Sequence, residues 1–178
     1  RRSLAGAALV GLLAVAVFAY GRGRLAEIDA QAPGDVPIAV VQGNVDLGAR
    51  WRQELYGQNL ESYLRQSQDA ARGGPVKLLF WPENAVTFFL EDEALYRYAI
   101  GHVLGPMGAQ LVTGGPHAEP GPPQRFYNSA FLVGSDGEVD GRYDKRVLMP
   151  FAEYYPAWLA LLSQRQFGGV REFSEGRP

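Results

Sequence analysis

The sequence predicts a mixed α/β domain built in layers and preceded by one apolar helix. A run without charged residues fills positions 4–20. Beyond it, short apolar runs with the composition of buried strands alternate with amphipathic helical patterns. An Asp-Gly pair at 136–137 then marks a hairpin turn. Strands that alternate with helices are typical of a layered sheet covered by helices, so we expect that architecture here.

Composition limits the classes of function. The 178 residues, 47% of them hydrophobic, suffice for the core of one domain. A formal net charge of −2 and dispersed basic residues argue against nucleic-acid binding. The absence of cysteine excludes disulfides and a cysteine nucleophile within these residues. Two scattered histidines, His102 and His117, do not suggest a metal site, and we expect neither metal nor cofactor.

The uncharged run at 4–20 is close to the roughly 20 apolar residues that cross a bilayer, which predicts a transmembrane helix with its flanks over residues 1–24. Arginines on both sides leave its orientation undecided. A cleaved signal peptide is one alternative, since Ala14-Val15-Ala16 resembles a cleavage site and the paired arginines at the start faintly resemble a twin-arginine signal. A buried helix of a soluble protein is another, but it would normally show a polar face.

Residues 25–37 are polar and contain Gly34 and two prolines, which predicts a linker to a domain over residues 38–178. Helices are expected from Trp51 onward and after the acidic residues 91–93, and a surface loop at 116–125. Strands are expected at 38–42, 76–80, 110–113, 127–133 and 138–145. The chain starts with Arg1 and stops at Pro178 without a closing element, so we expect it to be a piece of a longer protein.

Three charged residues stand where chemistry is expected. Glu83 ends an apolar strand, in Trp81-Pro82-Glu83, and a carboxylate in that setting needs a partner. Lys145, at the end of the hairpin, is the obvious candidate, and Glu153 lies in an aromatic loop bracketed by prolines. A carboxylate base and a cation that stabilises an oxyanion suit acyl transfer, although no nucleophile accompanies them. A structural ion pair and a loop carboxylate are the alternative interpretation.

Four motifs stand out together: Val40-Val41-Gln42-Gly43-Asn44, Trp81-Pro82-Glu83, Tyr127-Asn128-Ser129, and above all Tyr143-Asp144-Lys145-Arg146 running into Pro150-Phe151-Ala152-Glu153-Tyr154. They resemble the nitrilase-type domain of the apolipoprotein N-acyltransferases, which are carbon–nitrogen hydrolases. The resemblance covers the whole chain. Where the family usually has Phe-Gly-Glu, this chain has Phe151-Ala152-Glu153, which matters only if that glycine needs a positive φ angle.

The resemblance implies an incomplete nitrilase-like α-β-β-α sandwich, preceded by the transmembrane helix. It assigns the general base to Glu83, stabilisation of the tetrahedral intermediate to Lys145, and a supporting role to Glu153. It places Trp51 near the lipid entrance, although a core position on a helix face is equally compatible. Phe151 and Tyr154, with Tyr155 and Trp158, are expected either to line that entrance or to pack ordinarily. The nucleophilic cysteine of the family lies on a strand beyond Pro178.

The implied reaction is ping-pong acyl transfer. The cysteine takes an acyl chain from a phospholipid and passes it to the N-terminal amine of a diacylglyceryl-cysteine lipoprotein. The expected partners are therefore a phospholipid donor, a diacylated lipoprotein acceptor and the membrane, with the domain on the periplasmic side of the bacterial inner membrane. Two alternatives are a soluble nitrilase-type amidase that acts on small amides and a noncatalytic, membrane-anchored binding domain.

Overall fold

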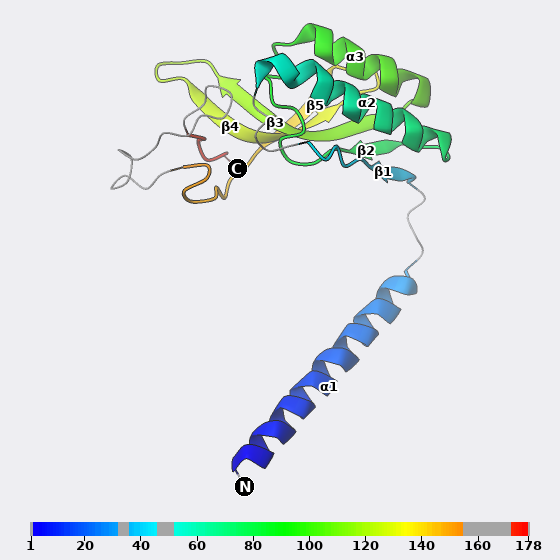
Figure 1. The fold of residues 1–178 in the computed structure, drawn as a ribbon, viewed down its shortest axis with the longest axis vertical. Helices are drawn as coiled ribbons and strands as arrows, with labels where there is room; N and C mark the ends of the chain where they lie inside the picture. Colours follow the sequence, from blue (N-terminus) through cyan, green and yellow to red (C-terminus); the bar gives the residue numbers. More distant parts are fainter. Residues whose placement is uncertain (1, 32–35, 46–51, 155–171, 178) are drawn as a thin grey trace. The chain divides into compact units, whose positions relative to one another are not determined.

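The computed structural model describes residues 2–31, 36–45, 52–154 and 172–177, and the chain forms two compact units, Arg1–Asp35 and Val36–Pro178. The first unit contains helix α1, Arg2–Asp29 (Figure 1). At about 1.5 Å per residue, its 28 residues correspond to about 42 Å. That length exceeds the ~30 Å hydrocarbon core of a bilayer.

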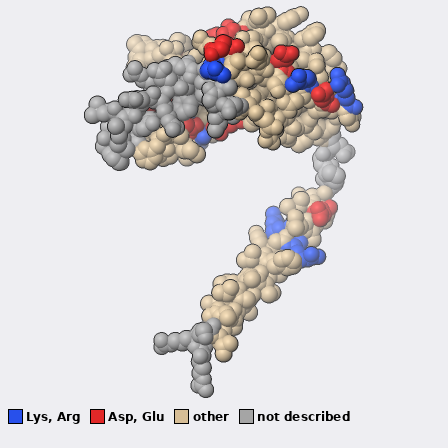
Figure 2. All heavy atoms as spheres, viewed as in Figure 1, with Lys and Arg blue, Asp and Glu red and all other residues tan. Residues whose placement is uncertain are grey.

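Charged side chains flank the uncharged middle of α1. Residues 4–20 carry no charged side chain, and Figure 2 shows blue and red atoms gathered at the end that contains Arg22, Arg24 and Glu27. Arg24 and Glu27 form an ion pair one turn apart. By length and composition α1 is able to cross a membrane, a property that signal sequences share. Residues 25–29, within the predicted linker, are helical.

The second unit is built on a five-stranded sheet whose strands follow chain order (Figure 1). The first three strands are parallel, and β3, β4 and β5 are antiparallel neighbours. The predicted order of three strands and a closing hairpin is thereby confirmed, and Gly137 occupies the hairpin turn with φ 88°. The strands are β1 (Ile38–Val40), β2 (Leu78–Phe80), β3 (Gln110–Glu119), β4 (Arg125–Val133) and β5 (Val139–Asp144).

Helices α2 (Tyr56–Arg72) and α3 (Ala94–Leu104) connect the parallel strands and lie on the same face of the sheet (Figure 1). Crossovers between parallel strands are right-handed, and both crossovers here advance to the next strand in the same direction, so both helices fall on one side. A 3-10 turn, η1 (Gln53–Leu55), precedes α2, and another, η2 (Gly105–Met107), follows α3. As predicted, α3 begins directly after the acidic residues 91–93.

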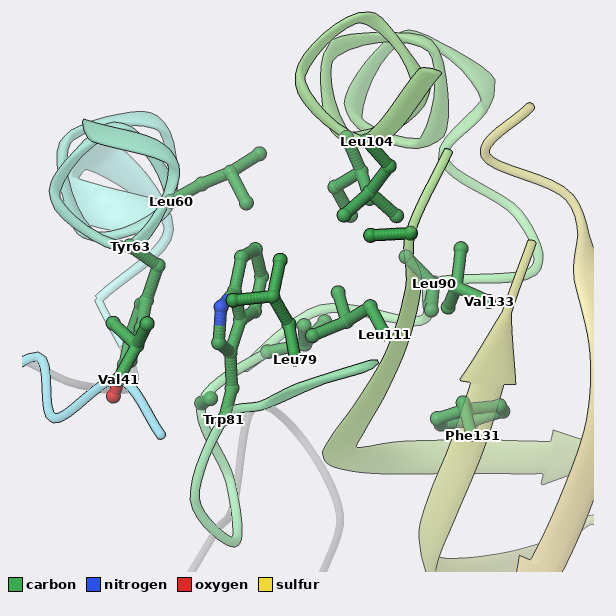
Figure 3. Packing of buried hydrophobic residues seen from close by; sticks show 14 of the residues in the cluster. Val41, Leu60, Tyr63, Leu79, Trp81, Leu90, Leu104, Leu111, Phe131 and Val133 are labelled. Atoms are coloured by element: carbon green, nitrogen blue, oxygen red, sulfur yellow. The ribbon is translucent and has the colours of Figure 1, made fainter. Parts of the chain in front are cut away.

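The main core lies between the helices and the sheet. Leu79, Leu111 and Phe131 are fully buried and come from three neighbouring strands (Figure 3). They share one cluster with Leu60 of α2 and Leu104 of α3. Because side chains alternate along a strand, every second residue points to this face. Burying one such side chain contributes about 1.5–3 kcal/mol, so this cluster fixes the sheet against the helices.

Strand β3 is longer than the sequence predicts. The expected strand ended at residue 113 and residues 116–125 were expected to be a loop, but β3 continues to Glu119 and pairs with β4 along its whole length. Proline in a strand normally interrupts pairing because it lacks an N–H donor. Pro116 is tolerated because β2 pairs only with residues 110–112 of β3, so position 116 has no partner in β2 to which an N–H would donate.

The opposite face of the sheet, here called the open face, is also apolar. No described helix or strand packs over it. Ile38, Val40 and Tyr143 are 57%, 75% and 58% exposed. The half-buried members of the open face are Leu78, Phe80, Val112, Ala130 and Leu132. The described residues therefore form one sheet and one helical layer. The open face is an apolar surface against which a further layer could pack.

We predict that residues 33–178, prepared alone, self-associate through the open face, because an apolar surface of this kind is unstable in water. Sedimentation velocity measures the association. Val40→Thr keeps strand propensity while reducing apolar area, and is expected to raise the monomer fraction. Leu95→Gln, on exposed α3 surface, is the matched control and should leave the monomer fraction nearly unchanged. A monomeric, cooperatively unfolding preparation would contradict the prediction.

Candidate active site

Glu83 follows β2 at the carboxyl end of the parallel strands, where open α/β sheets bind their ligands. Its segment is fixed to β3 by hydrogen bonds from Trp81 N–H to Val112 O (2.9 Å) and from Val86 N–H to Gly114 O (3.0 Å). A Cβ on Gly114 would lie 2.8 Å from Cα of Glu83, so only glycine permits this approach. The backbone of Glu83 is held against the sheet while its side chain stays 58% exposed.

Trp81 ties the same segment to α2. Its ring stacks on Tyr63 with centroids 5.1 Å apart, as Figure 3 shows beside Val41 and Leu79. Its indole N–H donates to Ser67 Oγ at 3.0 Å, and Ser67 in turn donates to the carbonyl of Tyr63 at 2.8 Å. A residue two positions before Glu83 is therefore anchored by packing and by hydrogen bonds.

Lys145 follows β5 and lies between two carboxylates. Its Nζ donates to Oε1 of Glu83 at 3.2 Å and to Oε1 of Glu153 at 3.0 Å. Its backbone N–H donates to the carbonyl of Asn128 on β4 at 2.8 Å. The predicted pairing of Glu83 with Lys145 is confirmed, and all three residues predicted to be catalytic meet at one place. Their chemical roles stay predictions.

Glu153 is held in a tight loop. Its Oε2 accepts a hydrogen bond from Met149 N–H at 2.7 Å, and its own N–H donates to Met149 O at 2.9 Å. Phe151 adopts φ 64°, a conformation that is costly for a residue with a side chain, and its N–H donates to Tyr154 O at 2.8 Å. Glu153 is thus fixed with its side chain only 9% exposed.

Asn128 completes the cluster, and sequence reasoning missed its contribution. Its Nδ2 lies 2.6 Å from Oε1 of Glu83 and 2.5 Å from Oε1 of Glu153. The residue is buried on β4, on the face that otherwise carries Ala130 and Leu132. Asn128 is a polar residue at a position where the alternating residues of the strand are apolar, and that pattern could have identified it as a site residue.

The charges of the cluster reinforce one another. Burial alone would raise the pKa of Glu153, but hydrogen bonds from Met149 N–H, Asn128 and Lys145 bring that pKa below its ordinary value. Burial alone would lower the pKa of the Lys145 ammonium, and hydrogen bonds and charge from Glu153 and Glu83 raise it above its ordinary value. At neutral pH the cluster therefore contains an ionised Glu153 and a protonated Lys145.

A cavity of about 330 Å³ adjoins these residues. Glu83, Asn128 and Lys145 line its polar part, and Val112 and Tyr143 belong to its apolar wall. A pocket with mainly apolar walls and a few convergent polar groups is typical of a site for a small molecule or a chain segment. The charged cluster therefore faces accessible space.

A second charged network supports Lys145 from the neighbouring residues of the same strands. Ser129 Oγ donates to Oδ1 of Asp144 at 2.6 Å, and Arg142 bonds both Asp144 (3.0 Å) and Glu91 (3.1 Å). Glu91 also contacts His117. The predicted loop position of His117 is wrong, because the residue is buried on β3. This network joins β3, β4, β5 and the segment before α3 directly beside the site.

The aromatic residues predicted to bind substrate differ in where the structure places them. Phe151 is 53% exposed beside Glu153, and Tyr154 is half-buried against Leu148 and Phe173. Trp51, like Tyr155 and Trp158, lies outside the described residues. Ala152 is not among the described residues with positive φ, so it fits where the family usually has glycine.

No cluster of metal-ligating side chains occurs in residues 2–31, 36–45, 52–154 and 172–177. A larger groove of about 630 Å³ lies between α2 and α3, where Leu95 and Tyr98 are exposed. Both residues line this groove. Among the described residues, no ion pair joins the charged side chains of this groove.

Comparison with known proteins places the chain among relatives of one family. The carbon-nitrogen hydrolase family model matches residues 37–161. Apolipoprotein N-acyltransferase of Geobacter metallireducens is 35% identical over 170 residues, which cover 94% of this chain and 32% of the relative. The protein of the same name from Rhodopseudomonas palustris is 34% identical, covering 88% of this chain and 30% of the relative. The chain therefore spans about a third of the length of these curated relatives.

Solved structures show the same fold. An amidase of the nitrilase superfamily from Nesterenkonia AN1 superposes with a TM-score of 0.51 at 20% identity, over 82% of this chain and 51% of the amidase. A carbon-nitrogen hydrolase from Helicobacter pylori gives a TM-score of 0.50 at 15% identity, over 80% and 45%. These likenesses confirm the predicted nitrilase-like α/β fold. The match of the family model over residues 37–161 shows that the chain belongs to the carbon–nitrogen hydrolase family.

Proposed function

We propose that this chain is part of an apolipoprotein N-acyltransferase and supplies two members of a Glu-Lys-Cys triad, Glu83 and Lys145. The observation that carries the proposal is the position of the Lys145 ammonium, within 3.2 Å of Glu83 and 3.0 Å of Glu153 beside an open cavity. The nucleophilic cysteine would belong to a part of the protein outside these 178 residues, which contain none.

In the first half of the reaction, Glu83 would accept the proton of the cysteine thiol. The thiolate then attacks the ester carbonyl of a phospholipid, and the ammonium of Lys145 stabilises the negative charge on the tetrahedral intermediate. The carbon–oxygen ester bond breaks, Glu83 returns its proton to the leaving alkoxide, and a lysophospholipid departs. The product is a thioester on the enzyme.

In the second half, the N-terminal amine of a diacylglyceryl-cysteine lipoprotein would attack the thioester. Glu83 again takes a proton, this time from the amine, and the thiolate leaves as the amide forms. Glu153 stays ionised throughout, because three donors lower its pKa, and it keeps Lys145 in place. This division gives each carboxylate a different task.

The position of the reaction at a membrane follows from its substrates, which do not leave the bilayer. We infer that α1, within residues 1–24, anchors the protein, that residues 25–37 lead to the domain at 38–178, and that the domain faces the periplasm at the inner membrane. Phe151, exposed beside the site, and Tyr154 are suited to contact an acyl chain, and Trp51 is proposed for the same entrance. Exclusion of water there would protect the thioester from hydrolysis.

A small-amide hydrolase is the second candidate, because amidases share the fold. Fold likeness at 20% identity says nothing about substrate, whereas relatives at 34–35% identity are N-acyltransferases. Assaying one preparation for hydrolysis of a small amide and for acylation of a lipopeptide amine separates the two. A noncatalytic binding domain would show neither activity.

We predict that Lys145→Met in the complete protein reduces transfer from phospholipid to lipopeptide by at least about 10²–10³-fold, because an oxyanion loses its charged donor. The assay is mass spectrometry of the acylated lipopeptide. Lys77→Met, at an exposed lysine that lines no part of the site cavity, is the matched control and should keep wild-type turnover. Retained turnover in the Lys145 variant would remove this residue from the mechanism.

A second prediction concerns Glu153 and pH. Its pKa is lower in the folded protein, so its contribution to stability is present above the ordinary carboxylate value of about 4.3 and disappears as the pH falls through the lower folded value. Glu153→Gln is expected to lower the free energy of unfolding at pH 7 by about 1–3 kcal/mol. Urea unfolding at several pH values should show this difference shrinking below about pH 4.

Glu61→Gln is the control for that experiment, because Glu61 is exposed on α2 and belongs to no described ion pair. It should change stability little at any pH. A difference between wild type and Glu153→Gln that stays constant from neutral to acidic pH would show that the carboxylate charge is not what stabilises the loop.

A further inference from the structure

Asn128 is a buried polar side chain that contacts every charged member of the site. It is 3% exposed, and its Nδ2 lies within 2.6 Å of both carboxylates. Its backbone carbonyl accepts a hydrogen bond from the backbone N–H of Lys145. Only the NH2 end of an amide can face two carboxylate oxygens, because the carbonyl end would repel them. The two N–H bonds of Asn128 therefore serve one carboxylate each.

The hydrogen bonds form a closed ring. Oε1 of Glu83 and Oε1 of Glu153 each accept from the same two donors, the Lys145 ammonium and the Asn128 amide. Two carboxylates that share one site tend to hold a proton between them. One ammonium neutralises only one of their charges. Asn128 supplies further donors to both carboxylates without adding charge.

The ring also makes the two carboxylates unequal. The second oxygen of Glu153 is occupied by Met149 N–H at 2.7 Å. No described residue donates to Oε2 of Glu83, whose side chain is 58% exposed and lines the cavity. Glu153 is therefore saturated with donors, while Glu83 keeps an oxygen that can accept a proton from a reacting group.

We infer that Asn128 is a positioning residue: by donating to both carboxylates it holds them on either side of the Lys145 ammonium, and it leaves Oε2 of Glu83 free for proton transfer. The inference deepens the proposed function and rests on it for the identity of the reaction. The hydrogen-bond pattern itself applies to any reaction in which Glu83 takes a proton.

The test uses the complete protein with Asn128→Asp, which has the size of asparagine but no N–H donors and one more acid. Asn128→Ala removes the donors without adding charge. Transfer to a lipopeptide at neutral pH is expected to fall by at least about tenfold in both variants, since a general base contributes about 10²–10⁴-fold. The acidic limb of the pH–rate profile should move to higher pH, further for Asp than for Ala, with activity partly regained in alkaline buffer.

Tyr127→Phe is the matched control, because it removes a hydrogen bond to Glu119 (2.8 Å) from the adjacent residue of β4 without touching the site. It should keep the wild-type pH profile. A merely structural role of Asn128 would lower the rate equally at every pH, and that result would overturn the inference. If Asn128→Ala does not fold, the pH–rate profile of the same-sized Asn128→Asp variant decides between the two roles.

A readout independent of activity separates this inference from the proposed function. Infrared difference spectra between acidic and neutral pH follow the carboxylate bands, which Glu83→Gln and Glu153→Gln assign. In Asn128→Ala the Glu153 band should titrate at higher pH than in the wild type, because the hydrogen bond from Asn128 lowers the pKa of that carboxyl. Unchanged bands would overturn the role of Asn128 even in an active transferase. A wild-type protein that acylates no lipopeptide would refute the proposed function, while the spectra still decide on Asn128.

Discussion

An ammonium shared by two carboxylates is the interaction on which the rest of this structure depends. Glu153 is nearly buried, and an unpaired buried charge costs several kcal/mol, so it requires the cation of Lys145. The same cation reaches Glu83, which is 62 positions away in sequence. This meeting is possible only if the ends of β2 and β5 come together across two intervening strands, which the sheet order provides.

Other features of the second unit maintain that meeting. Gly114 lets the Glu83 segment approach β3 closely, and Trp81 fastens the segment to α2. The pair of Ser129 with Asp144 fixes the register of β4 and β5 one residue away from Asn128 and Lys145. Core packing on the helical face therefore sets a polar arrangement on the opposite side of the same strands. On β4, the contact with the site and the contact with the core come from residues on opposite faces, Asn128 and Phe131.

The fold was largely predictable because the strands and helices have clear periodicities and because Asp-Gly marks the hairpin. The Glu83–Lys145 pair was also predictable, since a carboxylate after an apolar strand demands a partner. The continuation of β3 through Pro116 was not, because tolerance of that proline depends on how far β2 extends beside it. The prediction that His117 lies in a loop was wrong for the same reason.

The contribution of Asn128 could not be predicted from the sequence for a different reason. Its two hydrogen bonds reach Glu83, in the segment after β2, and Glu153, in the 149–154 loop, and only tertiary structure brings those segments to β4. Similarly, Ala152 could be judged only once the loop showed that Phe151, and not residue 152, adopts positive φ. Local patterns predict elements, whereas the donors that complete a charged site come from distant segments.

The central claim is that Glu83 activates a nucleophile for acyl transfer beside Lys145. The most direct measurement is mass spectrometry of the complete protein after incubation with phospholipid. We predict an acyl adduct on a cysteine outside the 178 residues, its transfer to an added lipopeptide amine, and its absence in Glu83→Gln. Equal adduct formation in Glu83→Gln, or no adduct on an intact wild-type cysteine, would contradict the account.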